Sequence, residues 1–195
     1  RAGTYVAVGG MNTRQAGEDV YFLHKVIERG HFADCAHCTV YPSARVSDRV
    51  PFGTGRAIGQ VKRGEPVLTH HPEIYRAVRR LVKLAPRLWD EEDDLSGEVP
   101  EVLGAFLAAQ GWPERLAEIR ANTASSAAFV KRLFRWFNAF RVMKFAHYAR
   151  DHGFPDVDVD VSFRALAEEM GWGGMADASR EGMLRKLREE ARSRK

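Results

Sequence analysis

The sequence predicts an α/β protein with two regions, an α/β region over residues 1–69 and a mostly α-helical region over residues 70–195. The first region alternates short β-branched and aromatic runs with glycine turns, which is typical of strands joined by tight connections. In the second region, apolar residues recur at helical spacing, and several segments begin with proline or serine. A hydrophobic content of 45% is ordinary for a chain with a packed core.

The first region is expected to contain one helix among strands and turns. Its predicted elements are a strand at residues 4–8 (TYVAV), a turn at Gly9-Gly10, a helix from Glu18 to Arg29 and a strand in CTVYPSARV. Within the helix, Val20, Leu23 and Ile27 recur at helical spacing. This stripe predicts that one face of the helix is buried against another part of the protein.

The second region is expected to be a series of helices. The predicted segments are residues 72–89, 100–111, 112–123, 126–151, 162–171 and 179–195, with the acidic stretch 90–98 as an exposed linker. The long helix at 126–151 interleaves aromatic and basic side chains. We favour core packing with the basic residues outward. The alternative is a basic helical module that binds an anionic membrane surface or nucleic acid.

Composition places few limits on the partner. The formal net charge is +4, from 30 basic and 26 acidic residues, so polyanionic partners are permitted but not required. No stretch approaches the roughly 20 uncharged apolar residues of a membrane span, and the N-terminus lacks a signal-peptide pattern. We expect a cytoplasmic protein with possible membrane association. Because the chain opens at Arg1 directly into a strand-like run, we also expect it to begin within a domain.

Two cysteines lie in the segment HFADCAHC, at Cys35 and Cys38. A structural zinc site needs four ligands, and the sequence has no second cysteine pair. The histidines that would have to complete the set are His31, His37, His70 and His71. The simpler interpretation is two reduced thiols beside a strand.

A run of alternating acids, DVDVDV, places carboxylates at Asp156, Asp158 and Asp160. The run does not fit a calcium loop, because Val161 stands where glycine is needed and Ala167 where glutamate is needed. We interpret it as a solvated segment that caps a helix starting near Ser162. No metal site is assigned to any residue of this chain.

The adjacent acids Glu18 and Asp19 stand at the predicted start of the first helix. Carboxylates there are favoured by the helix dipole, by about 0.3–1 kcal/mol each, and this purely structural explanation is common. The pair also follows Gly9-Gly10 and Gly17. Glycines at these turns indicate close backbone approach, caused by packing or by a ligand.

These residues resemble a known family. VGGMN followed by AGEDVYFLHKVIERG is similar to the acceptor-side segment of family 2 glycosyltransferases, in which a Gly-Gly turn leads to a Glu-Asp pair opening an apolar helix. VYPSARVSDRVPFGTGRAI and RLFRWFNAFRVMKFAHYAR resemble later parts of a bacterial branch of that family. The main resemblance covers about residues 4–60. It implies that residues 1–69 are the C-terminal part of a GT-A domain, with a mixed sheet, and that residues 70–195 are a helical extension.

The resemblance also implies a reaction, the inverting transfer of a sugar from a nucleotide-sugar. The second acid of the pair, Asp19, matches the family's general base, which takes the proton of the acceptor hydroxyl. Glu18 is cast as a hydrogen-bond partner of the acceptor or as a tuner of Asp19. The leaving diphosphate is compensated in the family by Mg or Mn held on an upstream Asp-x-Asp motif. No such motif precedes Asp19, so we expect the C-terminal portion of a longer enzyme, inactive without its upstream half.

The segment SARVSDRVPFGTGRAIG is predicted to be a loop that binds substrate. Its candidate residues are Arg45, Asp48, Arg49 and Arg56. Arginine forks match phosphate geometry, and a glycine-rich backbone can approach a diphosphate closely. The alternative is a surface loop in which Asp48 pairs with Arg45 or Arg49. The expected partners are a nucleotide-sugar donor, a sugar or lipid-linked acceptor and a membrane surface at its periphery, but not nucleic acid.

Overall fold

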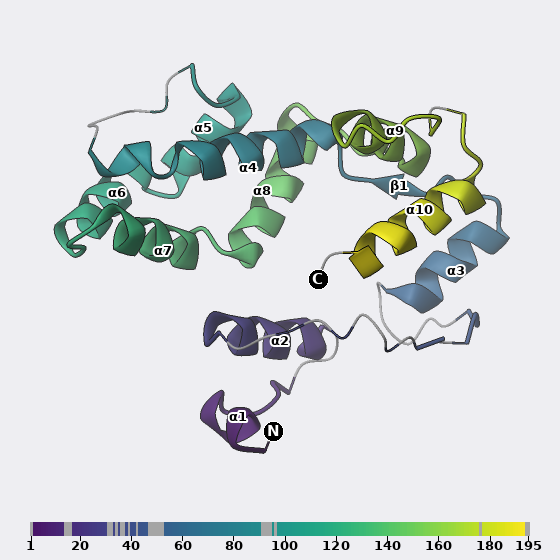
Figure 1. Cartoon of the computed structure of the whole chain (residues 1–195), viewed down its shortest axis with the longest axis horizontal. Coiled ribbons are helices and arrows are strands. Elements are labelled where there is room, and N and C mark those ends of the chain that lie inside the picture. Colours follow the sequence, from purple (N-terminus) through teal and green to yellow (C-terminus); the bar gives the residue numbers. More distant parts are fainter. Residues whose placement is uncertain are drawn as a thin grey trace. The chain divides into compact units, whose positions relative to one another are not determined.

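The computed structural model describes residues 2–13, 17–30, 33, 35, 38, 40–41, 43–46, 53–90, 95, 97–175 and 177–193. The chain divides into two compact units, unit 1 (Arg1–Val67 with Gly174–Lys195) and unit 2 (Leu68–Gly173). Helices dominate the described residues of both units (Figure 1). The mostly helical C-terminal region is therefore confirmed. No helix in the described part of the chain combines the length and the apolar content needed to cross a membrane.

The described elements of unit 1 are all helices: α1 (Ala2–Ala7), α2 (Glu18–Glu28), α3 (Thr54–Lys62) and α10 (Arg180–Ser193). The predicted helix from Glu18 is confirmed. The predicted strand at residues 4–8 is wrong, because residues 4–7 belong to α1. A strand needs a neighbour for its backbone groups, and the helix satisfies them within the segment, as when the Val8 amide donates to the Thr4 carbonyl at 3.2 Å.

The segment between α2 and α3 also departs from its prediction. None of the described residues in CTVYPSARV (38, 40–41 and 43–46) belongs to a strand, in contrast to the prediction. The predicted substrate loop ends earlier than expected, because its last residues enter α3 at Thr54. Gly53, the residue before this helix, has φ 98°, a backbone conformation that favours glycine.

Unit 2 is a set of helices with a small antiparallel sheet, formed by the strand that begins the unit and a strand that precedes its last helix. The elements are β1 (Leu68–Thr69), α4 (Pro72–Leu84), the 3-10 helix η1 (Arg87–Trp89), α5 (Glu101–Ala109), α6 (Trp112–Ala121), α7 (Ser126–Trp136), α8 (Ala139–His152), β2 (Val157–Asp158) and α9 (Val159–Glu169). In the sheet, Leu68 lies opposite Asp158 and Thr69 opposite Val157. Helix α4 packs on α8 and α9, α5 on α6 and α8, and α7 on α6 and η1 (Figure 1).

The core of unit 2 is aliphatic and aromatic. Its fully buried large side chains are Ile74, Leu81, Leu88, Leu103, Leu107, Ile119, Phe129, Leu133 and Phe145. The ring of Phe106 packs on Phe145 and Tyr148, with centroids 5.5 and 5.6 Å apart. Burial of one such side chain is worth about 1.5–3 kcal/mol. The interpretation of the 126–151 aromatic stripe as core packing is confirmed for Phe129, Leu133 and Phe137, which are buried, whereas Met143 in the same stripe is 45% exposed.

The single long helix predicted at 126–151 is wrong, since the chain breaks between α7 and α8. Asn138 caps α8, and its Oδ1 accepts hydrogen bonds from the Phe140 and Arg141 amides at 3.1 and 3.3 Å. Asparagine is among the preferred residues at a helix N-cap. The break turns Phe137 into the core, where it is 2% exposed. It also lets α7 pack on α6 while α8 packs on α4 and α5.

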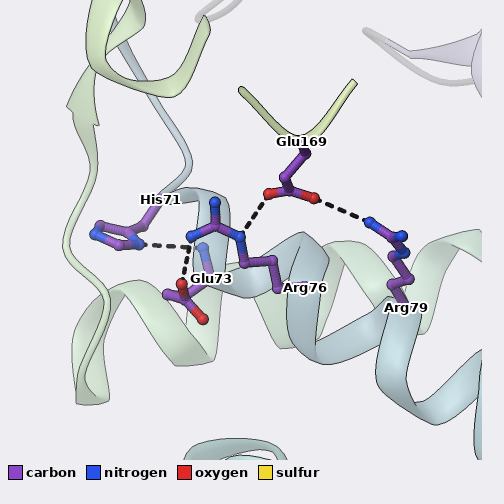
Figure 2. Close-up of polar contacts among 5 residues, drawn as sticks. All are labelled: His71, Glu73, Arg76, Arg79 and Glu169. Atoms are coloured by element: carbon purple, nitrogen blue, oxygen red, sulfur yellow. Dashed lines mark hydrogen bonds and ion pairs between the residues drawn. The ribbon is translucent and has the colours of Figure 1, made fainter. Parts of the chain in front are cut away.

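Charged side chains connect α9 to α4 (Figure 2). Glu169, at the end of α9, accepts from Arg76 Nε at 2.5 Å and from Arg79 Nη1 at 3.0 Å. Arg76 also donates to Glu73 at 2.5 Å, and the Glu73 amide donates to the ring of His71, the N-cap of α4. The two carboxylates raise the pKa of Arg76, because they stabilise its charged form.

Candidate functional site

The start of α2 carries the acidic pair proposed from the sequence. Gly17 is the N-cap, in the left-handed region at φ 75° and ψ 13°, and it offers no side chain to the exposed amides of the first turn. Asp19 partly replaces such a cap, since its Oδ1 accepts from the Val20 amide at 2.8 Å. Glu18 is half-buried and Asp19 is exposed. The structure thus places both acids in the first turn of a helix.

The pair lies at the positive end of the helix dipole, which favours carboxylates there by about 0.3–1 kcal/mol each. Among the described residues, neither Glu18 nor Asp19 forms an ion pair. The Asp19 carboxylate is exposed and can be reached by a hydroxyl group from solution. Geometrically it can act as a proton acceptor.

The Gly9-Gly10 turn contacts α2 through the side chain of Lys25. Both glycines have positive φ, at 72° and 68°. Lys25 of α2 donates to the Gly10 carbonyl at 3.2 Å and to Asn12 Oδ1 at 2.7 Å. A Cβ atom on Gly10 would lie 3.1 Å from the ring of Tyr5. The close backbone approach expected at this turn is therefore made by packing against an aromatic ring.

The sequence-based prediction did not include the cationic residues on one side of α2. Arg29 donates to the Ala7 carbonyl at 3.3 Å, as Lys25 does to Gly10. The sequence signal for these residues is the four-residue spacing of Lys25 and Arg29, because residues four apart share one side of a helix. These two cations satisfy carbonyl groups of the segment before α2. They hold the Gly-Gly turn beside the helix that carries the acids.

The apolar face of α2 is exposed, so the prediction that it is buried is wrong for the described chain. Val20, Leu23 and Ile27 are 56%, 44% and 51% exposed. The contact that α1 makes with α2 uses other positions, including Phe22, whose ring centroid lies 5.6 Å from that of Tyr5. Contiguous exposed apolar side chains of this kind mark surfaces that bind a partner.

The predicted substrate-binding residues that the structure describes, Arg45 and Arg56, lie in different elements. Arg45 is exposed in irregular structure, and its amide donates to the Ser43 carbonyl at 2.9 Å. Arg56 is exposed in the first turn of α3, and its charge contributes, after the larger effect of Arg63, to a lowered pKa of Glu65. Asp48 and Arg49 lie outside the described residues, as does the alternative pairing of Asp48 with an arginine.

The acids of DVDVDV have structural partners. Asp158 caps α9, with its Oδ1 accepting from the Asp160 amide at 2.9 Å, and this confirms the capping interpretation. The helix begins at Val159, earlier than the predicted start near Ser162. Asp156 lies 3.1 Å from Nδ1 of His70, which continues the cross-strand register of β1 and β2.

Within the described ranges there is no group of three or more His, Cys, Asp or Glu side chains placed to hold a metal ion. His31 and His37, which the zinc interpretation would need, lie outside those ranges. The described residues therefore do not fit the divalent metal that the resemblance implies for a longer parent enzyme. Comparisons with protein-family models, with curated proteins and with solved structures give no match to this chain.

Proposed function

We propose that this chain is the acceptor-side, C-terminal portion of an inverting glycosyltransferase of GT-A fold, which transfers a sugar from a nucleotide-sugar to an acceptor hydroxyl. The observation that carries the proposal is the acidic pair in the first turn of α2, where Asp19 is exposed and has no cationic partner among the described residues. A general base must be accessible and held in position. Asp19 is exposed, and its Oδ1 accepts a hydrogen bond from the Val20 amide at 2.8 Å.

In the proposed reaction, Asp19 accepts the proton of the acceptor hydroxyl while the oxygen of that hydroxyl attacks the anomeric carbon. The nucleoside diphosphate leaves from the opposite face, so the configuration at that carbon inverts. Glu18, one residue earlier and half-buried, hydrogen-bonds the acceptor sugar or tunes Asp19. Lys25 and Arg29 position the helix rather than react, because their cations bind backbone carbonyls.

The exposed face of α2 supports a longer parent. A GT-A enzyme needs nucleotide-binding strands, and the apolar stripe at Val20, Leu23 and Ile27 offers a surface that such a sheet would cover. We assign the divalent metal, Mg or Mn, to that upstream half. Arg45 and Arg56, with Asp48 and Arg49, are proposed for the donor side, where arginines compensate phosphate charge.

The test is Asp19→Asn in the full-length parent. Loss of a positioned base typically costs about 10²–10⁴-fold in rate, so we expect turnover to fall by this factor. The affinity for the nucleotide-sugar, measured by calorimetry, should stay nearly unchanged. Glu101→Gln is the matched control, an exposed first-turn acid of α5 that should leave turnover unaltered. Undiminished transfer by Asp19→Asn removes this residue from the base role.

A second candidate function rests on the surface of α7 and α8. Their aromatic residues pack largely inward, and the side chains left in solvent are mainly cationic, at Lys131, Arg132, Arg135, Lys144 and Arg150. Such a surface suits an anionic membrane or nucleic acid. Binding to anionic vesicles or to RNA that falls steeply with salt, and survives deletion of residues 1–69, would favour this module. Neutral vesicles serve as the control.

A further inference from the structure

The two cysteines lie close together in the segment between α2 and α3. The sulfur atoms of Cys35 and Cys38 are 2.7 Å apart. The Cys38 amide donates to the Cys35 carbonyl at 3.1 Å, the hydrogen bond that closes a four-residue turn. Such a turn keeps the two Cα atoms within about 7 Å, and disulfides span Cα separations of roughly 4.4–6.8 Å. The backbone already brings the thiols within bonding reach.

Both thiols are also accessible. Neither Cys35 nor Cys38 is part of a disulfide, and both are exposed, so a small oxidant can reach either sulfur without opening the fold. The contact with Cys35 raises the pKa of Cys38. The Cys38 thiol is therefore protonated at neutral pH, and its thiolate fraction grows as the pH rises.

We propose that Cys35 and Cys38 form a reversible intrachain disulfide, a redox-sensitive modification site that exchanges with small disulfides such as oxidised glutathione. This inference is independent of the sugar-transfer proposal. Closing the bond joins Cys35 to Cys38 within the segment between α2 and α3. Opening it restores two thiols.

The exchange proceeds in two balanced steps. One cysteine thiolate attacks a sulfur of the glutathione disulfide, forms a mixed disulfide and releases one glutathione thiolate, which takes up a proton. The second cysteine loses its proton and attacks the sulfur of the first, so the mixed bond breaks and a second glutathione leaves. Two protein thiols are oxidised by two electrons, and one glutathione disulfide is reduced to two glutathione molecules.

The experiment equilibrates the whole chain in buffers of varied reduced and oxidised glutathione, followed by acid quench, alkylation and mass spectrometry. We expect the wild-type chain to lose two hydrogens and both alkylation sites, with little mixed disulfide. Because the turn holds the thiols together, the equilibrium constant against glutathione should be on the order of millimolar or higher, the effective concentration of a short connection. Reduction with dithiothreitol should restore both sites.

The single variants Cys35→Ser and Cys38→Ser provide the matched controls. Each retains one thiol and should accumulate a persistent glutathione adduct, because no second sulfur resolves it. The inference is overturned if the wild-type chain accumulates the same adduct as the variants, or if its equilibrium constant lies on the order of 100-fold below millimolar. It is also overturned if added zinc is retained through dialysis and protects both thiols from alkylation.

Discussion

Unit 2 buries its apolar side chains, whereas unit 1 exposes similar ones. Helix α4 of unit 2 and helix α2 of unit 1 both carry apolar residues at helical spacing, yet Ile74, Ala77 and Leu81 are 0% exposed while Leu23 is 44% exposed. Among the described residues of unit 1, only Gly10, Gly59 and Met183 are buried. The comparison teaches that helical spacing defines an apolar face, and that a partner surface decides whether the face is buried.

The starts of four helices of unit 2 differ from the starts of α2 and α3. Side-chain caps begin α4, α7, α8 and α9 of unit 2, from His71, Ser125, Asn138 and Asp158. Helices α2 and α3 of unit 1 instead follow glycines, Gly17 and Gly53, which give no side-chain cap. Unit 2 thus carries both its own core and its own helix boundaries. In unit 1 the proposed chemistry sits on a helix with little packing.

The largest expected effect comes from one substitution made in both units. Leu81→Ala in α4 should lower the free energy of unfolding by about 2–5 kcal/mol, because it removes buried methyl groups and leaves a cavity. Leu23→Ala in α2 should change it by about 0.5 kcal/mol or less, as at other surface sites. Urea denaturation followed by circular dichroism measures both. Equal losses would contradict the contrast between the two units.

A smaller effect is expected at a helix cap. Asn138→Ala removes the acceptor for two amides at the start of α8 and should cost about 1 kcal/mol of unfolding free energy. Ser179→Ala, at the start of α10 in unit 1, removes the acceptor of the Gly182 amide and is the matched change. Because α10 buries few apolar side chains, Ser179→Ala should leave the stability of unit 2 nearly unchanged. Thermal denaturation measures both variants, and equal losses of stability for Asn138→Ala and Ser179→Ala would contradict the contrast between the two units.

The smallest expected effect concerns ion pairs. Glu169→Gln weakens both contacts from α9 to α4 and should cost about 1 kcal/mol, the upper end for partly exposed pairs. Glu181→Gln disrupts only the exposed pair with Arg185 inside α10 and should cost about 0.3 kcal/mol or less. High salt should reduce the loss of unfolding free energy caused by Glu169→Gln, because salt screens the ion pairs. Denaturation at low and at high salt measures this change. A salt-insensitive loss at Glu169 would point to packing rather than charge.

The sequence predicted most helices of unit 2 and the helix at Glu18, because amphipathic spacing and caps are local signals. It failed at residues 4–8, where β-branched and aromatic residues imitate a strand, although a strand exists only with a neighbour to pair with. It also missed the break at Asn138, since the apolar pattern continues through it. The spacing of Lys25 and Arg29 indicates one side of α2, but the partners of Lys25 and Tyr5 at the Gly-Gly turn could not be predicted, because they depend on contacts between separate segments.

The sequence by itself determined most helices of unit 2, which faces are apolar and where the acidic pair stands, because propensity, capping and the helix dipole act within a few residues. Only the tertiary structure decided that α4 is buried and the stripe of α2 is not, and that the aromatic side chains of α7 and α8 point largely into a core. Burial and proximity are properties of residues brought together from different elements. They have no local signature in the chain.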